Sequence, residues 1–79
     1  MVKLWLTDHF KFRMMERGVD IDHVKRAVKS PDFTKPNSDG SILARRRIDG
    51  KRIIEVVYRE LVLKRTRSLV MITAYYLLE

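Results

Sequence analysis

A chain of 79 residues with a hydrophobic fraction of 46% can bury one modest core, so we expect a single domain over residues 1–79. The absence of cysteine excludes disulfides and cysteine–zinc sites, and no stretch approaches the ~20 apolar residues of a membrane span. The net charge of +7 is concentrated in residues 41–79, which carry 9 basic and 4 acidic residues and favour a polyanionic partner such as RNA.

The first residues predict the cellular setting. The apolar stretch at residues 1–6 is too short for a secretory signal and lacks the small residues of a cleavage site. We therefore expect a cytoplasmic protein with no membrane partner. Glutamine is absent and asparagine occurs once, at Asn37, a composition typical of thermophile proteins.

Residues 2–6 are predicted to form an edge strand or an extended lead-in, with Trp5 covering the core. A first helix is expected over residues 7–17. Thr7 or Asp8 can cap its start, because a short side-chain oxygen can accept a hydrogen bond from a free backbone N–H there. Gly18 can close it in the left-handed conformation.

One arc of this helix carries its ionisable side chains, at about 100° per residue. They are His9, Arg13, Glu16 and Arg17, bordered by Phe10 and Phe12. Because aromatic residues flank the arc, we expect it to be partly buried beside other elements. A catalytic interpretation makes His9 an acid or base and lets Arg13 and Arg17 bind phosphate. In the alternative, Glu16 pairs with one of the arginines and His9 caps or packs locally.

A second helix is predicted over residues 21–30, capped by Asp20 and stopped by Ser30-Pro31. Asp20, Asp22 and His23 are residue types found in metal sites. Their place at a helix start is explained by the helix dipole, and no ligand set is complete, so we expect neither a metal nor another cofactor.

The chain then changes to a strand pattern. A short strand at 33–34 and a turn at 35–40 precede strands at 41–48 and 51–59, joined by Asp49-Gly50, a strong hairpin signal. A two-residue loop would place Arg47 opposite Arg52 and Arg45 opposite Ile54, so that the two facing arginines need a carboxylate, a bound anion or water between them.

The last third predicts a further hairpin. Leu61-Val62-Leu63 can prolong the preceding strand, and residues 64–67 supply a turn that no glycine or proline marks. The final strand, 68–77, is apolar on both faces, with strict alternation placing Tyr75 and Tyr76 on opposite sides. The expected fold is therefore α+β, with two N-terminal helices packed on a three- to four-stranded antiparallel sheet.

Basic side chains gather on the first hairpin. Arg45, Arg47, Lys51 and Arg52 are candidates for binding an RNA backbone. The alternative is a solvated face, or a strand edge charged against aggregation. Tyr75, beside Thr73, is the tyrosine we select to stack a base or donate a proton.

A family resemblance rests on four motifs: His9-x-x-x-Arg13-x-x-Glu16-Arg17-Gly18, Pro31 after the second helix, Val56-Val57-Tyr58, and Val70-x-Ile72-Thr73-x-Tyr75. Together they are similar to a small bacterial and archaeal domain family of unknown function. That family resembles the RelE-type toxins and, more loosely, the barnase–EndoU–colicin–RelE group of metal-independent ribonucleases.

The resemblance implies a RelE-like fold and RNA cleavage in a toxin–antitoxin setting. Its expected site residues are His9, Arg13, Arg17 and Tyr75 for catalysis, with Arg45, Arg47, Lys51 and Arg52 for RNA. The expected partners are RNA and either an acidic antitoxin or a second copy of the chain. The rival hypothesis is a non-catalytic interaction domain, in which the helix cluster is structural and the last strand marks a protein contact.

Overall fold

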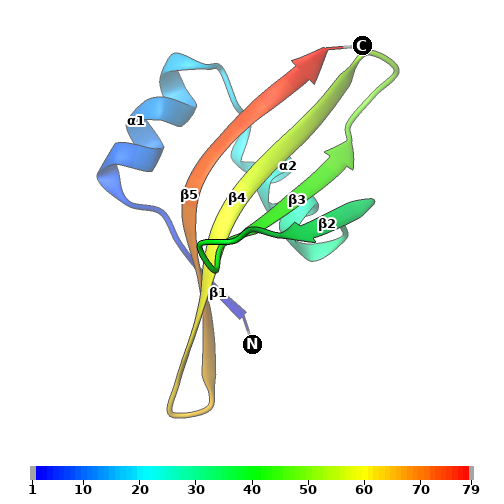
Figure 1. The fold of residues 1–79 in the computed structure, drawn as a ribbon. Coiled ribbons are helices and arrows are strands. Elements are labelled where there is room, and N and C mark those ends of the chain that lie inside the picture. The colour runs from blue at the N-terminus through cyan, green and yellow to red at the C-terminus, as the bar shows by residue number, and fades with distance from the viewer. Residues whose placement is uncertain (1, 79) are drawn as a thin grey trace.

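The computed structural model describes residues 2–78 (Figure 1). Its elements, in chain order, are β1 (Val2–Trp5), α1 (Asp8–Glu16), α2 (Ile21–Lys29), β2 (Phe33–Pro36), β3 (Ile42–Arg47), β4 (Arg52–Leu63) and β5 (Thr66–Leu78). The α+β class and both helices are as the sequence predicts. Neither helix is long and apolar enough to cross a membrane, within the residues described.

The sheet has five strands in the order β1-β5-β4-β3-β2 (Figure 1). All neighbours are antiparallel except β1 and β5, which run parallel through the pairs from Val2–Arg67 to Trp5–Val70. The prediction of a three- to four-stranded antiparallel sheet was therefore wrong. Two short segments of weak strand pattern, β1 and β2, become edge strands because longer neighbours supply their backbone partners.

Both helices begin and end as their capping residues predict. The Thr7 hydroxyl accepts a hydrogen bond from the Phe10 N–H at 3.1 Å, and Asp20 accepts one from the Asp22 N–H at 2.8 Å. Gly18 has a φ of +64°, which a residue with a Cβ rarely adopts. This tight connection sends α1 along the side of β5 and α2 across β3 and β4 (Figure 1).

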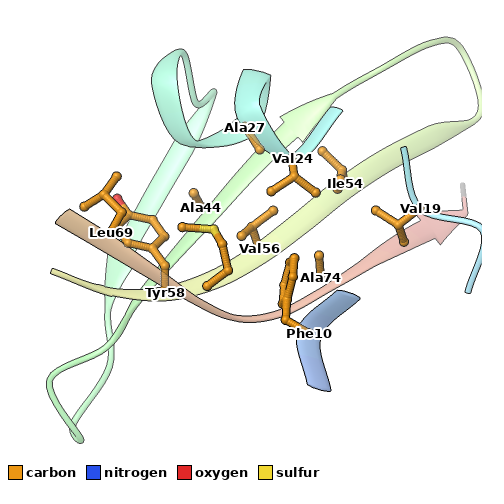
Figure 2. Packing of buried hydrophobic residues seen from close by; sticks show 11 residues of the cluster. Phe10, Val19, Val24, Ala27, Ala44, Ile54, Val56, Tyr58, Leu69 and Ala74 are labelled. Atoms are coloured by element: carbon orange, nitrogen blue, oxygen red, sulfur yellow. The ribbon is translucent and has the colours of Figure 1, made fainter. Parts of the chain in front are cut away.

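The core lies between the helices and one face of the sheet (Figure 2). Phe10 enters it from α1, and Val24 and Ala27 enter it from α2. The sheet contributes Ala44, Ile54, Val56, Tyr58, Leu69, Met71 and Ala74. We call the side of the sheet that carries these residues the helix face.

A β-bulge in β5 changes which residues reach the helix face. Val57 pairs with Thr73 and Tyr58 with Met71, so Ile72 has no partner on β4 and stands 40% exposed. The strict alternation expected for residues 68–77 was therefore wrong. An extra residue shifts the side-chain phase by one, so Leu69 and Met71 before the bulge and Ala74 after it all reach the core.

The β3–β4 hairpin is one residue out of the predicted register. Arg45 lies opposite Glu55 and Arg47 opposite Ile53, and Arg47 does not face Arg52. The cause is Asp49, whose carboxylate accepts the Lys51 and Arg52 N–H groups at 2.9 and 2.8 Å and widens the loop. These backbone hydrogen bonds and the Arg52 guanidinium lower the pKa of Asp49.

Beyond the end of β3, β4 and β5 continue as a hairpin, which we call the arm (residues 59–68; Figure 1), and β1 pairs with its β5 strand as far as Arg67. The turn at its tip is Lys64-Arg65, both with left-handed φ, 49° and 68°. Leu61–Leu63 do prolong the strand, as expected. Trp5 does not cover the core: it is 52% exposed and lines a groove with Leu61 and Leu63 of the arm.

Two phenylalanines of α1 allow the contributions of core and surface side chains to the free energy of unfolding to be compared. Phe10 is 1% exposed and Phe12 is 59% exposed. We expect Phe10→Ala to lower the free energy of unfolding by about 3–5 kcal/mol, because it removes a buried ring and leaves a cavity. Phe12→Ala is expected to change it by about 0.5 kcal/mol or less. Urea unfolding followed by circular dichroism measures both, and equal losses would contradict this packing.

Candidate functional site

The face of the sheet away from the helices has no helix over it, and we call it the open face. It carries the side chains that alternate with the core residues of β3, β4 and β5. They are Leu43, Arg45, Arg47, Ile53, Glu55, Val57, Thr73, Tyr75 and Leu77. Lys35 and Phe33 of β2 extend this face, through their pairing with Leu43 and Arg45.

One row of side chains crosses four strands of the open face. Phe33 pairs with Arg45, Arg45 with Glu55, and Glu55 with Tyr75. We call these four residues the cross-strand row. Directly opposed residues bring their Cβ atoms within about 4.5–5.5 Å, so each member can contact the next. Aromatic rings end the row, and a cation and an anion lie at its centre.

Glu55 is the best-held group of the row. Its side chain is 6% exposed, although the open face has no covering helix. Arg45 Nη2 donates to Oε1 at 2.7 Å, and the Tyr75 hydroxyl donates to Oε2. The Arg45 guanidinium also lies over the Phe33 ring, 5.5 Å from its centroid. Both carboxylate oxygens are thus satisfied by groups on the neighbouring strands.

The surroundings shift the titration of both acids in the row. Burial would raise the pKa of Glu55, but hydrogen bonds from Tyr75 and Arg45 and the charge of Arg45 outweigh it, so the pKa is lowered. The hydrogen bond to Glu55, with burial and the carboxylate charge, raises the pKa of Tyr75. At neutral pH the row therefore holds an ionised carboxylate and a protonated phenol.

Arg17 reaches this site from the end of α1. Its Nη1 donates to the Thr73 hydroxyl at 3.0 Å and to the Ala74 carbonyl at 3.2 Å, on the part of the β5 edge that β1 does not pair with. Its charge acts on the Tyr75 hydroxyl and partly offsets the rise in that pKa. Arg45 and Tyr75, which the sequence singled out separately, thus meet at Glu55, and Arg17 lies at the adjoining edge of β5.

The other candidates of α1 lie apart from this row. Arg13 pairs with Glu16 at 3.6 Å, and both side chains are about half exposed. This is the ion pair that the non-catalytic interpretation expected. His9 is exposed and has no hydrogen bond or ion pair to any of residues 2–78. The partial burial expected for the ionisable arc was wrong, because Phe10 alone turns into the core while Phe12 faces solvent.

The basic residues of the β3–β4 hairpin divide between the two faces. Arg47 shares the open face with Arg45, and its N–H donates to Asp32 at 2.8 Å. Lys51 is exposed in the loop. Arg52 lies over the Tyr76 ring on the helix face, 5.0 Å from its centroid. The four residues predicted to bind RNA therefore do not form one surface.

Tyr76 links the helix face to α2. Its hydroxyl lies 2.7 Å from His23 Nδ1 and accepts a hydrogen bond from the Asp20 N–H at 3.1 Å. His23 is thereby engaged in a structural contact between helix and sheet. No group of three or more His, Asp or Glu residues within 2–78 is arranged to hold a metal ion.

Sequence analysis missed Glu55. The signal was present, since Glu55 is the one charged residue in the apolar run Ile53-Ile54-Glu55-Val56-Val57. A charge at the centre of a strand is costly to bury without a partner, so it predicts a nearby cation. The predicted hairpin register placed Arg45 opposite Ile54, so the actual pairing of Arg45 with Glu55 was not foreseen.

The chain belongs to a family described as a domain of unknown function (DUF4258), whose model matches residues 6–76. That stretch contains α1, α2 and every member of the cross-strand row. Comparison with curated proteins and with solved structures finds no match.

The lowered pKa of Glu55 predicts a specific acid sensitivity. A carboxyl whose folded pKa lies below its ordinary value of 4.5 contributes stability above that value, and loses it as the pH falls through the folded pKa. We therefore expect wild type to lose more unfolding free energy than Glu55→Gln between neutral pH and pH values below 4.5. Urea unfolding across this range measures the difference, and parallel curves would contradict the pairing.

Proposed function

We propose that this member of the DUF4258 family binds RNA on the open face and cleaves it without a metal at the cross-strand row. The observation that carries the proposal is the ionised Glu55 carboxylate, held between Arg45 and Tyr75 with Arg17 at the adjoining sheet edge. The likeness to RelE-type toxins stays part of this proposal, as does an acidic antitoxin as the partner that would cover the basic surface.

The row has the groups that RNA transphosphorylation requires. Glu55 would accept the proton of the ribose 2′-hydroxyl, whose oxygen then attacks the adjacent phosphorus. The bond from phosphorus to the 5′-oxygen breaks, and Tyr75, kept protonated by its raised pKa, would donate a proton to that leaving oxygen. The products are a 2′,3′-cyclic phosphate and a free 5′-hydroxyl, so neither water nor a metal takes part in this step.

The arginines would stabilise the charge that develops on phosphate. Arg45 carries a guanidinium that is 41% exposed, so part of it faces solvent beside Glu55. Substrate binding would exchange some of its contact with Glu55 for phosphate oxygens. Phe33 is 49% exposed at the end of the row, where a ring can stack an unpaired base.

Arg13 and His9 have no part in this mechanism, which departs from the roles expected for them. Arg17, Arg45 and Tyr75 keep roles close to those expected, and Glu55 replaces His9 as the proton acceptor. Lys35 and Arg47 flank the row on β2 and β3 and would follow the RNA backbone on either side.

The rival function, a non-catalytic interaction domain, is supported by a different observation, the exposed apolar side chains of the arm. It predicts neither cleavage nor a salt-dependent affinity for RNA.

Incubation with mixed-sequence single-stranded RNA at low salt, with a chelator present, tests the proposal. Wild type is expected to produce cyclic phosphate ends, and Glu55→Gln to lower the rate by about 10²-fold or more while keeping RNA affinity. Arg45→Ala and Arg17→Ala are expected to weaken binding and to reduce its dependence on salt. Lys25→Ala, which removes a positive charge from an exposed position of α2, is the matched control and should behave as wild type.

Circular dichroism establishes that each variant is folded. Intact RNA together with no salt-dependent binding would contradict the proposal. Cleavage that persists undiminished in Glu55→Gln would leave RNA as the substrate but remove Glu55 as the proton acceptor.

A further inference from the structure

The arm has an unpaired strand edge. The β3–β4 ladder ends at the pair Ile42–Tyr58, and no strand within residues 2–78 lies on the β3 side of β4 after it. The Arg52 carbonyl accepts a hydrogen bond from Ile48, on the β3 side of β4. Because backbone groups alternate in direction along a strand, Glu60 and Val62 point theirs to this same side. The arm thus presents free backbone donors and acceptors to solvent.

The same stretch exposes apolar side chains. Leu61, Val62 and Leu63 are 49%, 62% and 71% exposed. With Trp5, Ser68 and Val70, Leu61 and Leu63 also line a groove of ≈ 200 Å³. The arm extends past β1 only at residues 63–66, because the β1–β5 ladder begins at the pair Val2–Arg67. Its tip adds strain, since neither Lys64 nor Arg65 favours positive φ. A further strand on the free side of β4 would satisfy the edge and bury part of these side chains.

We propose that this added strand is β4 of the arm of a second copy of the chain, running antiparallel and centred on Leu61. In this register Glu60 of one copy lies opposite Val62 of the other, so the residues that point their backbone groups outward meet each other. Leu61 lies opposite Leu61 on the two-fold axis. The contact is isologous and closes at two copies.

Charge supports this occupant and this direction. The unpaired charges of the arm are the cations at its tip, Lys64 and Arg65, because Glu60 pairs with Arg67 at 3.0 Å and Arg59 with Asp39 at 3.4 Å. Antiparallel pairing carries the two basic tips to opposite ends of the contact.

The pairing joins the two sheets into one. Opposed residues of antiparallel strands have their side chains on the same face, so both open faces lie on the same side of the dimer. The proposal stands independently of RNA cleavage, since the arm and the cross-strand row share no residue.

Light scattering after size exclusion, on full-length protein freed of nucleic acid, measures the assembly. Wild type is expected at twice the chain mass, shifting to the chain mass on dilution. Leu61→Asp is expected to weaken the dimer by at least about tenfold, because it opposes two carboxylates on the two-fold axis. Met15→Asp changes an apolar residue of α1 that is 80% exposed, and should remain dimeric. A monomeric wild type, or a dimer that nuclease treatment abolishes, would overturn the proposal.

Single cysteines test the register, because the chain has none of its own. Residues opposed at a non-hydrogen-bonded position lie about 4.5 Å apart between Cα atoms, within the range that a disulfide spans. Leu61→Cys is therefore expected to form a cross-linked dimer on mild oxidation several-fold faster than Leu63→Cys, which would face Arg59 of the other copy. Equal rates, or faster cross-linking at position 63, would overturn the pairing about Leu61.

Discussion

The extra residue in β5 decides which side chains of the C-terminal strand face the helices and which face the open side. Because Ile72 has no partner on β4, the alternation of side chains along β5 shifts by one residue there, and Met71 and Ala74 both reach the core. The same shift places Thr73 and Tyr75 on the open face and Tyr76 on the helix face, against His23. Bulges often reorient side chains next to functional sites. Here the bulge brings Tyr75 to Glu55 and leaves the Thr73 hydroxyl to Arg17.

The cross-strand row also shows how a small sheet can bury a carboxylate without a covering layer. Glu55 is flanked along β4 by Ile53 and Val57 and covered from the neighbouring strands by Arg45 and Tyr75. Two charge-assisted hydrogen bonds compensate the loss of water around the anion. Removing either donor would leave part of a buried charge unpaired, which is far costlier than losing a surface ion pair. The geometry of the row is therefore tied to the stability of the sheet.

Local signals in the sequence predicted local structure well. Thr7, Gly18 and Asp20 set the ends of the helices through contacts within a few residues, which a sequence pattern records directly. The hairpin register escaped prediction because the Asp49 side chain, not the usual two-residue turn, closes the loop. The bulge and the parallel pairing of β1 with β5 escaped because they depend on pairing between strands, although strands at both edges were expected. For the candidate site, the residue types on each element were predictable. That Arg45 and Tyr75 lie on either side of Glu55, with Arg17 nearby, could be known only from the pairing register of β3, β4 and β5.

The parallel pairing of β1 with β5 has a consequence for how the chain acquires this fold. Val2–Trp5 finds its partners only at Arg67–Val70, so the ladder joins segments separated by most of the sequence. Contacts between residues so far apart in sequence form late, because closing the large loop between them costs conformational entropy before the contacts can stabilise the chain. On the ribosome, the two helices can form early, while the first strand waits for nearly the last to emerge. Throughout that interval Val2–Trp5 lacks the backbone partners that Arg67–Val70 supply in the finished sheet.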